Sequence, residues 1–87
     1  MHDTPPVTPD SIRSSIQSGL DCPVLEVRGD GHHFEALVVS PAFEGLNRVA
    51  RHQRVYAALG DRMRQEIHAL SMTTLTPGEF AARQGQQ

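Results

Sequence analysis

Histidine is the residue in this 87-residue chain best suited to chemistry near neutral pH, and three of its five histidines stand beside apolar segments. His32 and His33 are adjacent in the stretch GDGHHFEALVVS, and His68 lies near the start of IHALSMTTL. A neutral imidazole binds metal ions and also titrates close to neutral pH. A metal or cluster site, a proton switch, a nucleic-acid contact and ordinary surface histidines are all open at this point.

Strand geometry limits how these histidines can combine. Successive side chains of a strand point to opposite faces, so if His32 and His33 are both extended, only one can share a face with His68. A site of three histidines from this chain is therefore awkward. One histidine of the turn and His68 could still give two imidazoles to one metal centre whose other ligands come from outside the chain. The alternative is that all three are hydrogen-bonded surface histidines.

The remaining reactive residues favour structural roles. The single cysteine, Cys22, excludes a C-x-x-C zinc knuckle, favours a reducing compartment, and is interpreted as a small buried hydrophobe. His52 is expected to be a half-buried packing residue. Neither a nucleophile with its base nor a pair of carboxylates is apparent, so we do not expect an enzyme.

Length and charge set the class of protein. A chain this short forms one domain, with residues 1–7 expected as a flexible leader, 8–83 as the domain and 84–87 as a frayed tail. The net charge of −2 gives no general reason to bind polyanions. No apolar run approaches the roughly 20 residues of a membrane span, and the first residues lack the features of a signal peptide. These observations favour a soluble, cytoplasmic protein.

The first half of the chain predicts a helix followed by a hairpin. Thr8 is a candidate N-cap and Pro9 suits the first position of a helix that ends near Gly19. The segments VLEVR, residues 24–28, and HFEALVVS, residues 33–40, are typical of strands. The turn from Gly29 to Gly31 is so short that these strands should pair antiparallel.

The second half predicts helices around a third strand. After a loop over residues 41–45, the apolar residues Leu46, Val49, Tyr56 and Leu59 indicate one face of a helix that Gly60 ends, and DRMRQE adds one or two further turns. The opposite face carries Arg48, Arg51 and Arg54, a charged stripe that could grip phosphates but is typical of any solvated helix face.

The segment IHALSMTTL, residues 67–75, is rich in β-branched and apolar residues and predicts the third strand. Thr76 and Glu79 then fit a capping box that opens a short helix through Phe80. The whole order is α-β-β-α-α-β-α. It predicts an α+β domain with a three-stranded sheet covered by helices on one face.

Several motifs together resemble the BolA family. HHF before an apolar strand, VSPAFEGLNRVARHQRVYAAL, and IHALSMTTLTPGEF are similar to the family pattern of S/H-H-F, V-S, F-x-G, R-H, V/I-H-A-L and T-P-x-E-W/F. The resemblance covers about residues 24–80, and the short turn is nearer the IbaG-type branch. It implies a fold like the type II KH domain, in agreement with the predicted element order.

The resemblance also implies a function. BolA-like proteins are partners of monothiol glutaredoxins in iron–sulfur cluster handling, where the glutaredoxin cysteine and glutathione hold one side of a [2Fe–2S] cluster. The histidine of V/I-H-A-L maps onto His68. For the ligand from the turn, His33 matches the family's S-H-F and His32 matches the position where some relatives carry a cysteine. The implied protein passes clusters to client apoproteins, holds none tightly by itself, and is a monomer or weak homodimer when alone.

A second function follows from the KH-like fold, because KH domains clamp single-stranded nucleic acid through a G-x-x-G loop. Some BolA-like proteins are described as transcriptional or stress regulators. In this chain the expected loop is ALGDRMRQ, in which Gly60 has no second glycine three residues later. This departure makes nucleic-acid binding the less favoured alternative, with Arg48, Arg51 and Arg54 as its expected surface.

Overall fold

The fold is a three-stranded sheet with its two longest described helices packed on one side. The computed structural model describes residues 7–30, 32–60 and 69–85. The elements run α1 (Pro9–Gly19), β1 (Val24–Gly29), β2 (Phe34–Val39), a 3-10 helix η1 (Pro41–Phe43), α2 (Arg48–Leu59), β3 (Leu70–Leu75) and α3 (Pro77–Gln84). The predicted α+β class is thereby confirmed. The further helical turns predicted at residues 61–66 lie outside the described residues.

The sheet is mixed, with β2 in the centre. β1 pairs antiparallel with β2 from Val24↔Val39 to Gly29↔Phe34, as the short turn predicts. β2 pairs parallel with β3 from Phe34↔Leu70 to Val39↔Leu75. Two parallel strands need a long crossover, and α2 forms part of it.

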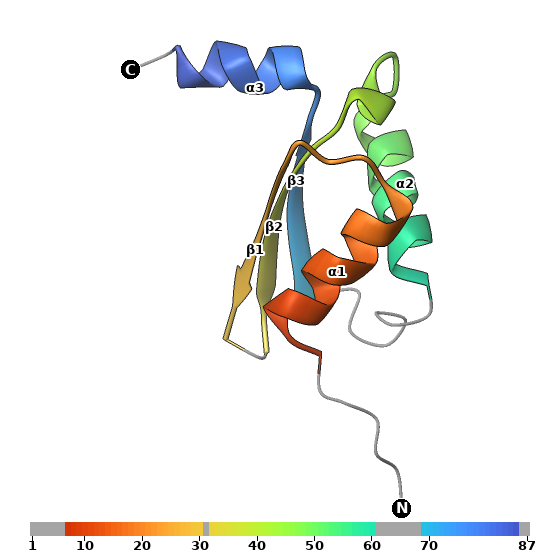
Figure 1. Cartoon of the computed structure of the whole chain (residues 1–87), viewed down its shortest axis with the longest axis vertical. Helices are drawn as coiled ribbons and strands as arrows, with labels where there is room; N and C mark the ends of the chain where they lie inside the picture. Colours follow the sequence, from red (N-terminus) through yellow and green to blue (C-terminus); the bar gives the residue numbers. More distant parts are fainter. Residues whose placement is uncertain (1–6, 31, 61–68, 86–87) are drawn as a thin grey trace, which may run out of the picture.

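The helices α1 and α2 lie side by side on one face of the sheet, and α3 extends from the end of β3 toward the other side (Figure 1). The core fills the space between α1, α2 and the sheet. Its buried residues are Ile12, Ile16, Leu20, Leu25, Phe34, Ala36, Val38, Phe43, Val55, Leu59 and Leu70. No helix in the described part of the chain is long and apolar enough to cross a membrane.

A capping box starts α1, and small residues let it pack against α2. The Thr8 hydroxyl accepts a hydrogen bond from the backbone N–H of Ser11, and the Ser11 hydroxyl accepts one from the backbone N–H of Thr8. At the other end, a Cβ added to Gly19 would lie 2.9 Å from the Cβ of Ala58. The two helices therefore approach closely where the side chains are smallest.

The face that α2 turns to the core differs from the predicted one. Val55 and Leu59 are buried, whereas Val49, which was predicted on the apolar face, is 65% exposed. Arg51, which was predicted on the solvated face, is instead only partly exposed. Residues at spacing four share a helix face, so Arg51 lies on the same side as Val55 and Leu59.

The helix boundary explains this error. The side-chain oxygen of Asn47 accepts the backbone N–H of Ala50, and Asn47 is the N-cap. Leu46 therefore precedes the helix, and counting it within the helical pattern rotated the predicted face. The predicted end of α2 is confirmed, because Gly60 follows it with a φ of 63°, a value that favours glycine.

The last helix is longer than predicted. Thr76 and Glu79 form the expected capping box, but α3 continues beyond Phe80 to Gln84. The residues after Phe80 are good helix formers and no glycine interrupts them before Gly85. Pro41–Phe43, predicted as part of a loop, forms the 3-10 helix, with the Ser40 hydroxyl accepting the backbone N–H of Ala42.

Replacing Gly29 by alanine should destabilise the hairpin. A Cβ at Gly29 would lie 2.5 Å from the carbonyl oxygen of His33 and 2.5 Å from Cδ1 of Phe34, so the strands would have to shift. We expect Gly29→Ala to lower the free energy of unfolding by about 1–3 kcal/mol, measured by urea denaturation. Gly78→Ala is the matched control, because its Cβ would meet nothing nearer than 3.9 Å. Equal stability of the two variants would refute the close approach at Gly29.

Candidate functional site

The turn that carries the two histidines is held by one carboxylate. Oδ1 of Asp30 accepts the backbone N–H groups of both His32 and His33, each at 2.9 Å, and the backbone N–H of Asp30 donates to the carbonyl of His33 at 3.2 Å. These backbone hydrogen bonds hold the pKa of the Asp30 carboxyl below its ordinary value. Neither histidine belongs to a strand, so the predicted start of the second strand at His33 is wrong by one residue.

The side chain of His33 reaches the third strand. Its Nε2 lies 3.3 Å from Oγ of Ser71, which is the second residue of β3, and the two groups share a hydrogen bond. Both histidine side chains of the turn are exposed. An open depression of about 580 Å³ beside the turn is lined by Arg28, Gly29, Asp30, His33 and Glu35. The hydrogen bond thus orients the imidazole of His33 at one end of the sheet, while the side chain remains accessible to solvent.

His68 lies outside the described residues, but the residues that follow it are described. Ala69 packs against the core, and Leu70 begins β3 opposite Phe34, the first residue of β2. Because β2 and β3 are parallel, both strands begin at the same end of the sheet. His33 immediately precedes β2, at the end of the sheet where Ala69 leads into β3.

The described residues do not form a complete metal site by themselves. Among residues 7–30, 32–60 and 69–85, no group of three histidine, cysteine or acidic side chains could hold a metal ion. Asp30 was predicted only as part of the turn, and Ser71 only as part of the third strand. The turn motif itself could have indicated Asp30, because an aspartate commonly accepts backbone N–H groups of the next residues. Nothing in the local sequence pairs His33 with Ser71.

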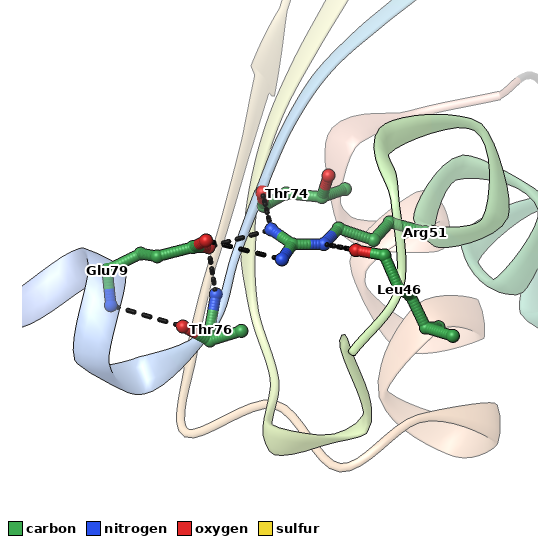
Figure 2. Close-up of polar contacts among 5 residues, drawn as sticks. All are labelled: Leu46, Arg51, Thr74, Thr76 and Glu79. Carbon is green, nitrogen blue, oxygen red and sulfur yellow. Dashed lines mark hydrogen bonds and ion pairs between the residues drawn. The ribbon is translucent and has the colours of Figure 1, made fainter. Parts of the chain in front are cut away.

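Arg51 is a structural link between four parts of the chain (Figure 2). Its Nε donates to the carbonyl of Leu46 at 2.8 Å, and its Nη1 donates to the carbonyl of Thr74 at 3.1 Å. Nη1 and Nη2 also donate to the two carboxylate oxygens of Glu79, at 2.7 and 3.2 Å. The side chain of Arg51 is 14% exposed. The guanidinium therefore joins α2, the loop before it, β3 and α3.

The Glu79 carboxylate serves both this ion pair and the capping box. Its Oε1 accepts the backbone N–H of Thr76 at 2.8 Å in addition to the guanidinium N–H of Arg51. Hydrogen bonding to Arg51, and then to the backbone of Thr76, lowers the pKa of Glu79 from 4.5 to about 2. The carboxylate is thus charged throughout the physiological range.

The three arginines of the predicted stripe do not share one surface. Arg48 and Arg54 are exposed, whereas Arg51 faces the sheet and binds Glu79. The prediction that Arg51 lies on the solvated face is therefore wrong. The reason is that α2 buries the face that carries Val55, and Arg51 lies on that same face.

Cys22 and His52 occupy the structural positions expected of them. Cys22 is half-buried against the core, and burial, followed by the charge of Asp21, raises the pKa of its thiol. His52 is half-buried with its ring edge-on to Tyr56, the ring centroids being 6.5 Å apart. Burial, followed by the charge of Arg48, lowers the pKa of His52. Neither arrangement activates the residue for chemistry.

The sequence pattern and this fold correspond to one known family. The model of the family described as BolA-like protein matches residues 7–79. The chain belongs to the BolA family. The Acid stress protein IbaG of Escherichia coli is 37% identical over 71 residues, which covers 80% of this chain and 84% of that protein. The predicted nearness to the IbaG-type branch agrees with this similarity.

Other BolA relatives are longer than this chain. BolA-like protein 1 of cattle is 36% identical over 80 residues, covering 80% of this chain and 59% of that protein. The DNA-binding transcriptional regulator BolA of Haemophilus influenzae is 39% identical over 56 residues, covering 64% of this chain and 54% of that protein. The chain thus spans a little more than half the length of these two relatives.

The BolA fold is also supported by a solved structure. The bolA protein homologue of Coxiella burnetii is 47% identical to this chain, with a TM-score of 0.71. The match covers 86% of this chain and 97% of the Coxiella chain. The mixed sheet and the helices described above are therefore those of a BolA domain.

Removing the Asp30 carboxylate should loosen the histidine turn without unfolding the domain. Asp30→Ala deletes the acceptor for the backbone N–H groups of His32 and His33, so we expect these two amides to exchange hydrogen faster. Hydrogen exchange followed by NMR measures this effect. Asp30→Asn is the control, because its amide oxygen still accepts these bonds. Unchanged exchange in Asp30→Ala would mean that another group holds the turn.

The ion pair of Glu79 should make stability depend on acid pH. Since the folded pKa is about 2 and the ordinary value is 4.5, the contribution of the carboxylate is complete above pH 4.5 and is lost as pH falls toward 2. We expect the stability difference between the wild type and Glu79→Gln to shrink over this range, measured by urea denaturation.

A double-mutant cycle assigns this effect to Arg51. In an Arg51→Met background, Glu79→Gln should have a much smaller pH-dependent effect, because the largest cause of the pKa shift is absent. An equally large effect in that background would show that the Thr76 backbone, and not Arg51, lowers the pKa.

Proposed function

We propose that this protein is a partner of a monothiol glutaredoxin and contributes histidine ligands to a shared [2Fe–2S] cluster. The observation that carries the proposal is the parallel pairing of β2 with β3, because both strands then begin at one end of the sheet. The exposed histidine turn lies at that end, and His68 precedes the first residue of β3 by two positions in the sequence. Membership of the BolA family supports the same function. In this function the protein would hand clusters to client apoproteins in the cytoplasm.

The fold supports a division of ligands between two proteins. Cys22, the single cysteine, precedes β1, whose first residue pairs with Val39 at the end of β2 that is remote from the histidine turn. Six residues of strand span about 20 Å, so the thiol of Cys22 cannot join the imidazoles of the turn. The sulfur ligands of such a cluster must come from outside this chain, and a glutaredoxin cysteine and glutathione would supply them.

The histidine side chains suit this role. A ligating imidazole must present a neutral nitrogen and is usually oriented by a hydrogen bond from its other nitrogen or from its surroundings. The turn histidines are solvent-exposed and their backbone is fixed by Asp30. Replacing thiolate by imidazole raises the potential of a [2Fe–2S] centre, and protonation of the histidine can release the iron. These properties suit cluster transfer better than electron transport at low potential.

Cluster reconstitution of the two proteins together tests the proposal. A monothiol glutaredoxin, glutathione, iron and inorganic sulfide are combined under anaerobic conditions, with and without this protein, and analysed by visible circular dichroism and size exclusion. We expect a new spectrum that elutes with a one-to-one complex and is lost in His68→Ala. His2→Ala, the same substitution at a histidine that is not a candidate ligand, is the control and should retain the spectrum. A wild-type spectrum in His68→Ala would refute His68 as a ligand.

The ligand from the turn requires a further control. His33→Ala removes both an imidazole and the hydrogen bond to Ser71, whereas Ser71→Ala removes only the hydrogen bond. If His33 is the ligand, His33→Ala should lose the cluster spectrum while Ser71→Ala and His32→Ala keep it. If His32 is the ligand, His32→Ala should lose the spectrum while His33→Ala and Ser71→Ala keep it.

A second candidate function is nucleic-acid binding by a transcriptional or stress regulator. The relative from Haemophilus influenzae is named a DNA-binding transcriptional regulator, and this name is the specific observation in its favour. The exposed arginines Arg48 and Arg54 would be its surface, since Arg51 is engaged with Glu79. Titration with nucleic acid at several salt concentrations tests this candidate, because phosphate contacts weaken steeply with salt.

A further inference from the structure

The face of the sheet that α1 and α2 leave uncovered carries a serine close to the histidine turn (Figure 1). Phe34 and Leu70, the first residues of β2 and β3, are buried in the core. Because side chains alternate between the two faces of a strand, the next residues, Glu35 and Ser71, lie on the face opposite the core. Both side chains are exposed, so a group bound to Ser71 on this face remains accessible from outside.

The parallel register places Ser71 within reach of the turn. Glu35 is the partner of Ser71 across the sheet, and His33 precedes Glu35 by two positions. Nε2 of His33 lies 3.3 Å from Oγ of Ser71, and the two groups share a hydrogen bond. This bond therefore joins the histidine turn to the strand that follows His68 in the sequence.

The two histidines of the turn differ in how their rings are held. Among the residues that the structure describes, the His33 ring is hydrogen-bonded to Ser71 alone, and the His32 ring has no hydrogen bond. The carboxylate of Glu35, the neighbour of Ser71 across the sheet, lies 3.6 Å from Nε of Arg28. Asp30 holds both histidines only through their backbone N–H groups. Ser71 is thus the group that distinguishes His33 from His32.

We propose that Ser71 is a positioning residue that selects His33, over His32, as the iron ligand from the turn and leaves Nδ1 of His33 to bind. The inference rests on the proposed cluster function, and it names the nitrogen and the supporting group. In a neutral imidazole one nitrogen carries a proton and the other a lone pair. When Nε2 donates its proton to Oγ of Ser71, the lone pair is on Nδ1.

An oriented ring is the better ligand of the two. A metal-binding histidine usually donates its other ring N–H to a nearby oxygen, which fixes both its tautomer and its orientation. A side chain that is already oriented loses less conformational freedom when it binds than one that rotates freely. The hydrogen bond of His33 therefore favours it as a ligand, although both rings are exposed.

Nitrogen-15 NMR of the metal-free protein tests the hydrogen bond without a cluster. At mildly alkaline pH, where imidazole is neutral, we expect His33 to show more of the tautomer with its proton on Nε2 than His32 shows. In Ser71→Ala the ring signals of His33 should move toward those of His32, which is the internal reference. Ser71→Thr keeps the hydroxyl and should keep the wild-type signals. Thr73→Ala is the matched control, because it removes a hydroxyl two positions further along the same strand face.

The rate at which the assembled cluster loses iron to a chelator tests the selection. In the complex with glutaredoxin and glutathione, Ser71→Ala should keep the visible circular dichroism spectrum. It should lose iron about two- to tenfold faster than the wild type, which is the range that one hydrogen bond contributes. Ser71→Thr, Thr73→Ala and His32→Ala should lose iron at the wild-type rate.

Three results would overturn the inference. Identical ring signals of His33 in the wild type and in Ser71→Ala would show that the bond does not hold the ring. Equal rates of iron loss in these two proteins would show that the bond does not support ligation. Loss of the cluster in His32→Ala, with retention in His33→Ala, would assign the ligand to His32.

Failure of the proposed function gives a different result. If the wild-type protein formed no cluster complex with glutaredoxin, the function and the ligand assignment would both be wrong. The NMR comparison of the metal-free wild type with Ser71→Ala would still show whether Ser71 orients His33, so the two failures are distinguishable.

Discussion

The parallel pairing of β2 with β3 is the constraint on which the arrangement of this BolA domain depends. Because both strands run in one direction, their first residues, Phe34 and Leu70, lie side by side at one end of the sheet. Their last residues lie side by side at the other end. The connection must then return along the whole length of the sheet, and α2 does so while covering the core. The hairpin turn and Ala69, which immediately precedes β3, are therefore brought to the same end of the sheet by topology and not by any local sequence signal.

The opposite end of the sheet depends on one guanidinium. Arg51 satisfies the outward carbonyl of Thr74, ties the loop before α2 through Leu46, and holds the carboxylate that caps α3. Since α3 has no buried residues of its own, its attachment relies on this ion pair and on the capping box more than on a hydrophobic face. The depressed pKa of Glu79 reflects the same contacts, because they stabilise the charged carboxylate.

The sequence was sufficient for features that are decided within a few residues. The capping box of Thr76 and Glu79, the antiparallel hairpin and the helix end at Gly60 were all predicted correctly because each follows from local backbone chemistry. The inward position of Arg51 could not be predicted, since an arginine at the edge of a helix face is assigned to solvent unless its partner is known. That partner lies 28 residues away along the chain.

The two ends of β3 are held by different kinds of interaction, and this difference has a functional consequence. At the first end, Asp30 holds the histidine turn through bonds to residues two and three positions away, so the turn can loosen alone. At the other end, Arg51 joins four elements, so its loss disturbs α2, β3 and α3 together. Sites that exchange a ligand are drawn from the less stable parts of a protein, whereas docking surfaces gain from rigidity. The locally held turn therefore suits reversible ligation, whereas the end of the sheet that Arg51 holds is a rigid support for the fold.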